Sequence, residues 1–267
     1  IGGQFNMAKR IPGKEEFHET LRYFGSQIAR TGVRLHLNTR ADAARLIADK
    51  FDDVVLATGV VPRDPKIKGQ DGANVLSYID VLAGRKPVGQ KVAVIGAGGI
   101  GFDIAEYLVH EGHSPTLDLP TWRAEWGVGD PAETRGGLKR PEISAPARQV
   151  TLLQRKQGKP GAGLGKTTGW IHRSALKMKR VEMLSGVNYD GIDERGLHIS
   201  FGEKRKHPTL IEADTIVLCT GQEPLRELEA PLVAAGVKVH RIGGADVASE
   251  LDAKRAIDQG SRLAARL

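Results

Sequence analysis

The chain carries the sequence KVAVIGAGGIG at residues 91–101, an apolar run that leads directly into a glycine-rich turn. Residues 91–95 have the length and apolar character of a buried strand. Gly96, Gly98 and Gly101 give the G-x-G-x-x-G pattern, and apolar positions at helical spacing follow through residues 104–109. A strand, a glycine turn and a helix in this order are typical of a dinucleotide-binding βαβ unit.

Each of the three glycines has a separate physical role in such a turn. Gly96 allows the tight bend after the strand, Gly98 lets the backbone approach a pyrophosphate, and Gly101 allows the helix to pack closely on the strand. The helix N-terminus adds free amide donors and a partial positive charge. We therefore expect these three glycines to bind a dinucleotide.

The end of the following strand predicts which dinucleotide binds. Sites for NAD place an acidic residue there, which accepts hydrogen bonds from the 2′-hydroxyl of the ribose. This chain has Arg155 and Lys156 at that position, and two cations favour the 2′-phosphate of NADP(H); the alternative is an ordinary basic strand end. The 54 residues from Gly101 to Arg155 exceed the usual spacing of about 20, and we attribute the excess to an insertion at residues 111–148.

The insertion has a composition of its own. It is rich in proline, glycine and charged residues, and Trp122 and Trp126 are its large aromatic anchors. Its role stays open at this point, because docking on another domain and covering an edge of its own domain fit the sequence equally well.

The rest of the chain continues the alternation of strands and helices. Apolar runs at residues 53–57, 150–154 and 215–219 predict buried strands, and alternation at residues 33–37 predicts a half-buried strand. Strands that alternate with helices and glycine turns indicate an α/β fold with parallel sheets.

The composition is that of an ordinary globular protein. Hydrophobic residues make up 40% of the chain and charged residues 27%, which argues against disorder or a fibrous repeat. The longest apolar stretch, residues 54–61, falls far short of the roughly 18 to 20 residues that a membrane helix needs. A net charge of +7 permits phosphate-bearing ligands but does not point to nucleic acid. Because Cys219 is the only cysteine, we expect a cytoplasmic chain whose redox chemistry comes from organic cofactors.

Two further segments carry a pattern that suits a flavin. Thr58 and Gly59 end one predicted strand, and the sequence GGAD at residues 243–246 precedes the C-terminal helix. An Asp after paired glycines can hold the ribityl hydroxyls of a flavin while helix amides face its pyrophosphate. The alternative is that Asp246 is a helix N-cap.

Other catalytic patterns are incomplete. Residues 165–167 read GKT, like the end of a P-loop, but Pro160 stands where that loop needs its first glycine. His110 and His113 lack the spacing of the HExxH zinc motif, and the remaining histidines are scattered. Cys219 lies inside an apolar strand, which favours a buried packing role.

Longer strings in the chain point to one family. They are IGGQFNMAKRIPGKEEF (1–17), VLSY (75–78), GAGGIGFD (96–103), LQRK (153–156), GLGKTTGWIHR (163–173), GQEP (221–224) and ELDA (250–253). With these strings the chain resembles the C-terminal FAD- and NADPH-binding part of bacterial 2,4-dienoyl-CoA reductase, in the old yellow enzyme-like group that includes trimethylamine dehydrogenase. The resemblance extends over essentially the whole chain, and the string at residues 163–173 is far more specific than a glycine fingerprint.

The resemblance implies a Rossmann-like NADP-binding domain inserted into a truncated FAD-binding domain. The expected boundaries are residues 1–88 for the first part of the FAD domain, 89–212 for the NADP domain and 213–267 for the second FAD part. It also implies that NADPH passes hydride to FAD. From FAD, electrons pass through a [4Fe-4S] cluster to FMN, which reduces an unsaturated acyl-CoA in fatty acid β-oxidation.

The resemblance also implies contacts with the cofactors. The residues expected at FAD are Gln4, Ala41, Thr58, Gly59, Gly244 and Asp246. Arg155 and Lys156 are expected to hold the phosphate of NADPH. The segment around Ala41 departs somewhat from the family pattern, and no catalytic acid or nucleophile is assigned within the chain.

In that family the FMN-bearing barrel, the cluster cysteines and the first FAD strand precede the part that this chain matches. We therefore expect a fragment that works with an N-terminal FMN and iron–sulfur part of the same polypeptide, without nucleic acid or membrane partners. The chain alone is expected to be inactive on acyl-CoA and to hold FAD weakly or not at all. A trimethylamine dehydrogenase-like domain that binds ADP and a non-catalytic nucleotide-binding module are the alternatives.

Overall fold

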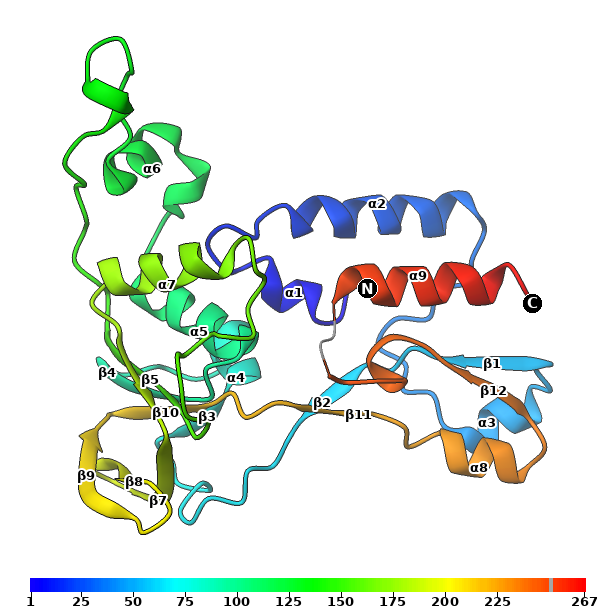
Figure 1. Ribbon diagram of the computed structural model, residues 1–267. Coiled ribbons are helices and arrows are strands. Elements are labelled where there is room, and N and C mark those ends of the chain that lie inside the picture. The colour runs from blue at the N-terminus through cyan, green and yellow to red at the C-terminus, as the bar shows by residue number, and fades with distance from the viewer. Residues whose placement is uncertain (250–251) are drawn as a thin grey trace. The chain divides into compact units, whose positions relative to one another are not determined.

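The computed structural model describes residues 1–249 and 252–267 and divides the chain into two compact units (Figure 1). The first unit comprises Ile1 with residues 26–64 and 221–267, and the second comprises residues 2–25 and 65–220. Glu250 and Leu251, in the ELDA string, lie outside the described residues.

The second unit is built on a five-stranded parallel sheet in the order β3-β10-β4-β5-β6. Its strands are β3 (Val75–Ser77), β10 (Thr215–Leu218), β4 (Lys91–Ile95), β5 (Gln149–Gln154) and β6 (Glu182–Ser185). The central strands are buried on both faces, which explains why β4 and β5 read as continuous apolar runs.

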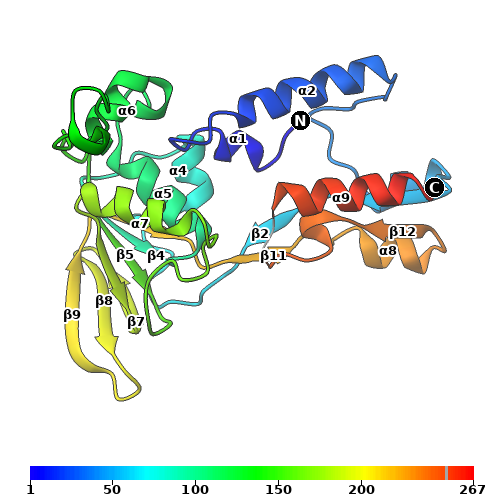
Figure 2. The same ribbon diagram turned by 45° about the horizontal axis from the view of Figure 1, so that its top comes forward.

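Alternate residues of β4 enter two different hydrophobic cores. Val92 and Val94 pack in the core that holds α4 (Tyr78–Ala83), α5 (Gly99–Val109) and Leu176 of α7 (Gly169–Met178). Ala93 and Ile95 pack in the core beneath an antiparallel meander of β7 (Val187–Asp193), β8 (Gly196–Phe201) and β9 (Lys206–Glu212). Figure 2 shows the sheet between this helical layer and the meander.

The predicted insertion folds into short elements within the second unit. It contains η1 (Pro115–Leu117), α6 (Leu119–Trp126) and η2 (Arg135–Gly137), and Asp118 caps α6 by accepting a hydrogen bond from the Thr121 amide. The indoles of Trp122 and Trp126 lie 6.3 Å apart, centroid to centroid. The insertion therefore packs as part of its own unit.

The first unit is a smaller α/β arrangement. β1 (Asp53–Leu56) pairs in parallel with β12 (Lys238–Arg241), and β2 (Val60–Pro62) pairs antiparallel with β11 (Gln222–Pro224). Its small core gathers residues of β1 with α3 (Ala43–Ala48), α8 (Glu229–Ala234) and η3 (Gly243–Ala245).

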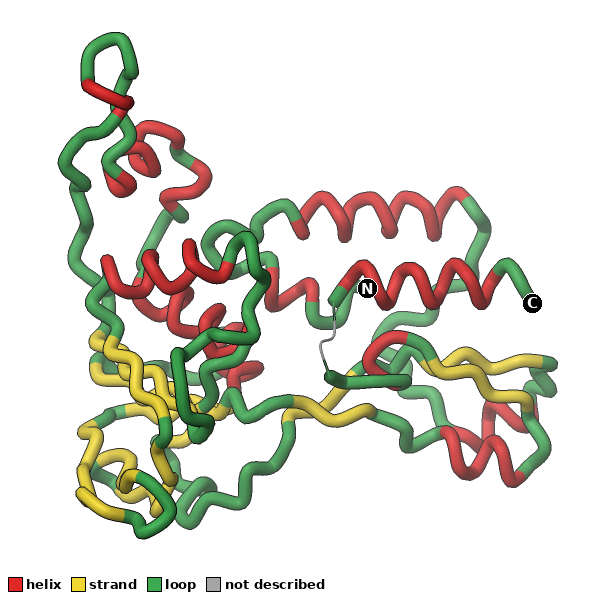
Figure 3. Tube along the Cα trace, viewed as in Figure 1, coloured by secondary structure: helices red, strands yellow, loops and turns green. Residues whose placement is uncertain are grey.

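The remaining helices are α1 (Phe5–Ala8), α2 (Phe17–Arg30) and α9 (Ala253–Ala264), none of which has a fully buried residue. The strand predicted at residues 33–37 is wrong: the segment between α2 and α3 is loop and turn (Figure 3). Val33, Leu35 and Leu37 are exposed. Among the described residues β1 pairs with β12, and no strand pairs with residues 33–37, so their backbone groups have no sheet hydrogen bonds to make.

The predicted α/β class with parallel sheets is confirmed. The compact units divide the chain after Ile1, Gly25, Asp64 and Thr220, whereas the expected domain boundaries were at 88/89 and 212/213. The divisions after Asp64 and Thr220 differ from the expected ones because β3 and β10 pair within the sheet of β4. Among the described residues, none of the helices has both the length and the apolar character that crossing a membrane requires.

Candidate functional site

The glycine turn between β4 and α5 is fixed by close packing. The Gly96 amide donates to the carbonyl of Leu153 at 2.8 Å, and Gly96 has a φ of +114°. A Cβ on Gly96 would lie 2.2 Å from the carbonyl oxygen of Cys219, and a Cβ on Gly101 would lie 1.7 Å from that of Gly96. Two of the three fingerprint positions are therefore glycine because no side chain fits.

Gly98 is different, since nothing in the protein requires it to lack a side chain. Its φ of −84° is accessible to any residue, and a Cβ there would meet no atom within 4 Å. Gly98 is the N-cap of α5, an eleven-residue helix with no acidic residue in its first turn. Open space over bare backbone at a helix N-terminus fits a pyrophosphate, whose charge the amides and the helix dipole stabilise.

Arg155 and Lys156 follow β5, the parallel neighbour of β4, and both are exposed. Because Ile95 pairs with Leu153, these cations leave the sheet at the same edge as the glycine turn. No carboxylate among the described residues forms an ion pair with either of them. Both charges are therefore available to a ligand.

The loop that carries these cations is held by its neighbours. The Gln154 side-chain amide donates to the carbonyls of Lys156 at 3.0 Å and Gly158 at 3.2 Å. The Gly186 amide donates to the same Lys156 carbonyl at 3.2 Å. Sequence reasoning missed Gln154 as a positioning residue, although its place at the strand end next to Arg155 was visible.

The glycine-rich loop that follows packs onto α5. Gly161 has a φ of +72°, and a Cβ there would lie 2.6 Å from the ring of Phe102. Arg173 of α7 donates to the Gly161 carbonyl at 3.0 Å.

The expectation that Cys219 is a buried packing residue is confirmed, and burial raises the pKa of its thiol far above the usual range.

In the first unit, the loop after β1 and the η3 turn, which the resemblance assigns to one cofactor, lie against each other. A Cβ on Gly244 would lie 3.0 Å from the carbonyl carbon of Gly59, so the two backbones touch. The Thr58 hydroxyl donates to the Leu225 carbonyl at 2.6 Å, and the Leu225 amide donates to the Gly59 carbonyl at 3.0 Å. Thr58 is thus a structural anchor of this loop.

Asp246 lies at the end of η3 and does not cap α9, a role that Asp252 fills by accepting from the Arg255 amide at 2.6 Å. Gln259 of α9 donates to Asp246 Oδ2 at 2.9 Å and accepts from the Gly243 amide at 2.7 Å. No hydrogen bond from the described residues is directed at Asp246 Oδ1. This oxygen can accept a ligand hydroxyl.

Gln4 and Ala41 are not joined to this group by hydrogen bonds within the described residues. Gln4 is exposed at the start of α1 in the second unit and makes no side-chain cap. Ala41 is exposed in the first unit, directly before Asp42, the N-cap of α3.

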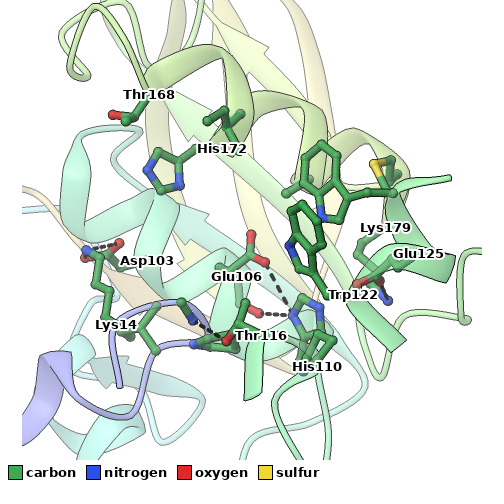
Figure 4. Close-up of a pocket in the computed structure, with 18 of the residues that line it drawn as sticks. Lys14, Asp103, Glu106, His110, Thr116, Trp122, Glu125, Thr168, His172 and Lys179 are labelled. Atoms are coloured by element: carbon green, nitrogen blue, oxygen red, sulfur yellow. Dashed lines mark hydrogen bonds and ion pairs between the residues drawn. The ribbon is translucent and has the colours of Figure 1, made fainter. Parts of the chain in front are cut away.

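Sequence reasoning also missed a cavity of about 410 Å³ in the second unit, lined by α5, α6, α7 and residues 11–17 (Figure 4). Inside it, the buried Lys179 ammonium lies 2.6 Å from the Glu125 carboxylate and 2.6 Å from the Ser144 hydroxyl. The signal in the sequence was a polar stripe of Asp103, Glu106 and His110 on an otherwise apolar helix. No group of three or more His, Cys, Asp or Glu residues in the described ranges could hold a metal ion.

Comparison with known proteins supplies the family. The family model described as pyridine nucleotide-disulphide oxidoreductase matches residues 5–256. The metal reductase of Desulforamulus reducens is 30% identical over 231 residues, which are 85% of this chain and 33% of that protein. The NADH oxidase of Thermoanaerobacter brockii is 36% identical over 121 residues, which are 44% of this chain and 19% of that protein.

Among solved structures, a complex of 2-naphthoyl-CoA reductase with 2-naphthoyl-CoA aligns at a TM-score of 0.76 and 26% identity. The alignment covers 100% of this chain and 34% of that one. The chain thus spans about a third or less of the length of these proteins.

Proposed function

The chain belongs to the pyridine nucleotide-disulphide oxidoreductase family, and we propose that it is the NADPH- and FAD-binding half of a 2,4-dienoyl-CoA reductase. Family membership makes it a flavin and pyridine-nucleotide oxidoreductase domain. The observation that carries the choice of NADPH is the pair of exposed, unpaired cations Arg155 and Lys156 at the sheet edge of the glycine turn.

The residues around the glycine turn fit NADPH. The amides at the start of α5 and the open space over Gly98 suit the pyrophosphate. A ribose 2′-phosphate brings about two negative charges and acceptor oxygens, which Arg155 and Lys156 can meet with charge-assisted hydrogen bonds. An acidic residue in that place would instead favour the free 2′-hydroxyl of NADH, the nucleotide named for the Thermoanaerobacter brockii oxidase.

The group in the first unit fits FAD. Asp246, held in place by Gln259, has a carboxylate oxygen that no described residue engages, and a side chain at Gly244 would collide with the backbone of Gly59 and with Val60. When bound, NADPH supplies a hydride that FAD accepts as an electron pair. The chain's own residues bind and orient: Gln259 holds Asp246, and Thr58 fixes the loop after β1.

The acyl-CoA substrate and the partner are parts of the same proposal. The 2-naphthoyl-CoA reductase likeness supports a thioester of coenzyme A as the final electron acceptor. Since the chain spans about a third of that protein, we assign the acyl-CoA chemistry to an N-terminal FMN and iron–sulfur part of the same polypeptide. This proposal involves neither nucleic acid nor a membrane.

Anaerobic reduction of the flavin tests the proposal. NADPH is added to the FAD-loaded polypeptide that contains both this chain and the proposed N-terminal part, while the visible flavin absorbance is followed, and a 2,4-dienoyl-CoA is then added to re-oxidise the flavin. The proposal predicts bleaching by NADPH, little bleaching by NADH, and recovery with the dienoyl-CoA. Bleaching by NADPH without recovery would reject the dienoyl-CoA substrate, and equal bleaching by NADH would reject the phosphate-binding role of Arg155.

A further inference from the structure

The two tryptophans of the insertion line a cavity that the proposed cofactors do not use. The cavity of about 410 Å³ is lined by α5, α6, α7 and residues 11–17. On α5, Ile104, Ala105 and Leu108 are buried in the core, whereas Asp103 and Glu106, together with His110 directly after the helix, line the cavity. The cavity therefore lies on the face of α5 opposite the sheet, and the glycine turn is not part of its lining.

Most charged groups in the cavity already have a partner. Lys14 holds both oxygens of Asp103 at 2.6 and 2.7 Å, and Lys179 holds Glu125 at 2.6 Å. Figure 4 draws these two ion pairs on opposite sides of Glu106. Glu106 is left without a cation of its own.

Glu106 has one oxygen that nothing satisfies. Its Oε2 is buried and has no hydrogen-bond partner among the residues that the structure describes. His110 Nδ1 lies 3.6 Å from Oε1, but it lies closer, at 2.9 Å, to the backbone carbonyl of Glu106, to which it can donate. Burial lowers the pKa of His110, so the ring is neutral and does not balance the carboxylate.

The environment of Glu106 works against its charge. Burial raises the pKa of Glu106 to about 7, with the Glu125 charge adding to the rise and Lys179 opposing it. Asp103 on the same helix adds a further negative charge. Burial also lowers the pKa of His172 on α7, with Lys14 adding to the effect, so this ring supplies no cation either.

Packing of α5 against its neighbours does not require a carboxylate with an unsatisfied oxygen at position 106. An unsatisfied buried carboxylate oxygen destabilises a protein by about 1 to 3 kcal/mol, and an apolar residue would avoid that cost. The wall around it includes the indoles of Trp122 and Trp126 together with Ile171 and Met178. A partly open pocket of this size, with an apolar wall and one buried carboxylate oxygen left unsatisfied, is of the kind that binds small molecules, and the other unpaired carboxylate of the lining, Glu16, is exposed to solvent.

We propose that this cavity binds a small organic cation, with an ammonium group donating to Glu106 Oε2 and an apolar or aromatic body against Trp122 and Trp126. We expect the ligand to be a cation, because Lys14 and Lys179 are already in ion pairs and the buried group without a partner, Glu106, is acidic. Tryptophan is the aromatic side chain that attracts cations most strongly. This inference does not rest on the proposed function, since it concerns another face of α5.

Three probes with one aromatic body and different charge test the site. They are 2-phenylethylamine, 2-phenylethanol and phenylacetate, titrated into the intact protein while tryptophan fluorescence is followed. Trp170 is exposed and does not line the cavity, so within residues 1–267 the Trp170→Phe background leaves Trp122 and Trp126 as the reporters. The amine is expected to bind at least about tenfold more tightly than the alcohol, since hydrogen bonds to charged groups are worth about 1.5 to 3 kcal/mol, and phenylacetate is expected not to bind.

Two matched substitutions place the binding at Glu106. Glu106→Gln keeps the shape and removes the charge, and we expect it to weaken the amine at least about tenfold while NADPH affinity is unchanged. Glu111→Gln makes the same change of charge at an exposed residue outside the cavity and should leave amine binding as it is. Trp122→Leu, which keeps an apolar wall, should weaken the amine and spare the alcohol.

The pH dependence adds a readout that a structural role would not move. As Glu106 ionises between about pH 6 and about pH 8, the affinity for the amine should rise by about tenfold, and Glu106→Gln should abolish this rise. Absence of amine binding, equal affinity for the amine and the alcohol, or full amine binding by Glu106→Gln would each overturn the proposal.

Discussion

Two alanine substitutions in the same glycine turn should separate ligand binding from packing. In Gly101→Ala the new Cβ would lie 1.7 Å from the Gly96 carbonyl oxygen, where real contacts are at least 3.0 Å. Helix α5 would have to move away from a fully buried strand. Overpacking of this kind costs about 1 to 3 kcal/mol or more, and because the obstacle is backbone we expect at least about 3 kcal/mol.

Gly98→Ala should behave in the opposite way. Its φ of −84° suits alanine and the new methyl group meets no protein atom. Restricting the unfolded chain stabilises by about 0.4 to 1 kcal/mol, which roughly offsets the poorer N-cap. A pyrophosphate approaching the backbone would meet that methyl group and lose one or two charge-assisted hydrogen bonds, so NADPH affinity should fall at least about tenfold.

Urea denaturation gives the stabilities, and calorimetric titration with NADPH gives the affinities. The free energy of unfolding of Gly98→Ala should lie within about 0.5 kcal/mol of wild type. Wild-type NADPH affinity in Gly98→Ala would refute the assignment of the pyrophosphate to this turn. Wild-type stability in Gly101→Ala would refute the packing argument.

Three further changes test the surroundings of the site. Lys179→Met leaves Glu125 buried without its partner and should reduce the free energy of unfolding by about 3 to 5 kcal/mol, whereas adding Glu125→Met should restore most of it in urea denaturation; equal loss in both variants would contradict this. Because the pKa of Glu106 is raised from 4.5 to about 7, the folded protein binds the Glu106 proton more tightly, and the contribution of Glu106 to wild-type stability should fall as pH rises between these values, against the opposite contributions of His110 and His172, whose pKa values are lowered. Glu106→Gln should remove this fall and be about 2 to 3 kcal/mol more stable than wild type at about pH 8, which unfolding at a series of pH values checks; the same pH slope in both proteins would argue against it. Gln154→Ala removes the side-chain hydrogen bonds to the carbonyls of Lys156 and Gly158, leaving only the Gly186 amide on Lys156. It should weaken NADPH binding by about three- to tenfold with less than about 1 kcal/mol lost in stability, and calorimetry showing unchanged affinity would exclude a positioning role.

The parts of the fold that could be predicted are those determined by residues close together in the sequence. The apolar run of β4 and the glycines after it describe one strand and one turn, whose requirements are met by neighbouring residues. Alternation at residues 33–37 was just as regular, yet a strand also needs a partner ladder, and no pattern within the segment can supply one.

The candidate sites divide in the same way. Thr58 and Gly59 were matched with Gly244 through the family resemblance, and in the structure both segments follow strands of one parallel ladder, β1 and β12. The cavity could not be predicted, since Glu106 and Lys179 come together only through the packing of three helices and an irregular segment. Its polar stripe on α5 looks like an exposed helix face until the insertion is seen to cover it.

The most direct measurement is calorimetric titration of the protein with NADPH, NADH and ADP, in wild type and in Arg155→Ala/Lys156→Ala. The variant Lys204→Ala/Lys206→Ala removes the same charge from exposed residues at the β8–β9 turn and serves as the control.

We expect NADPH to bind much more tightly than NADH in wild type and in the control. In Arg155→Ala/Lys156→Ala, NADPH affinity should fall by roughly 2 to 4 kcal/mol, the value of two charge-assisted contacts, to that of NADH. Equal binding of NADPH and NADH by wild type, or binding of ADP alone, would contradict the NADPH assignment and favour a trimethylamine dehydrogenase-like domain.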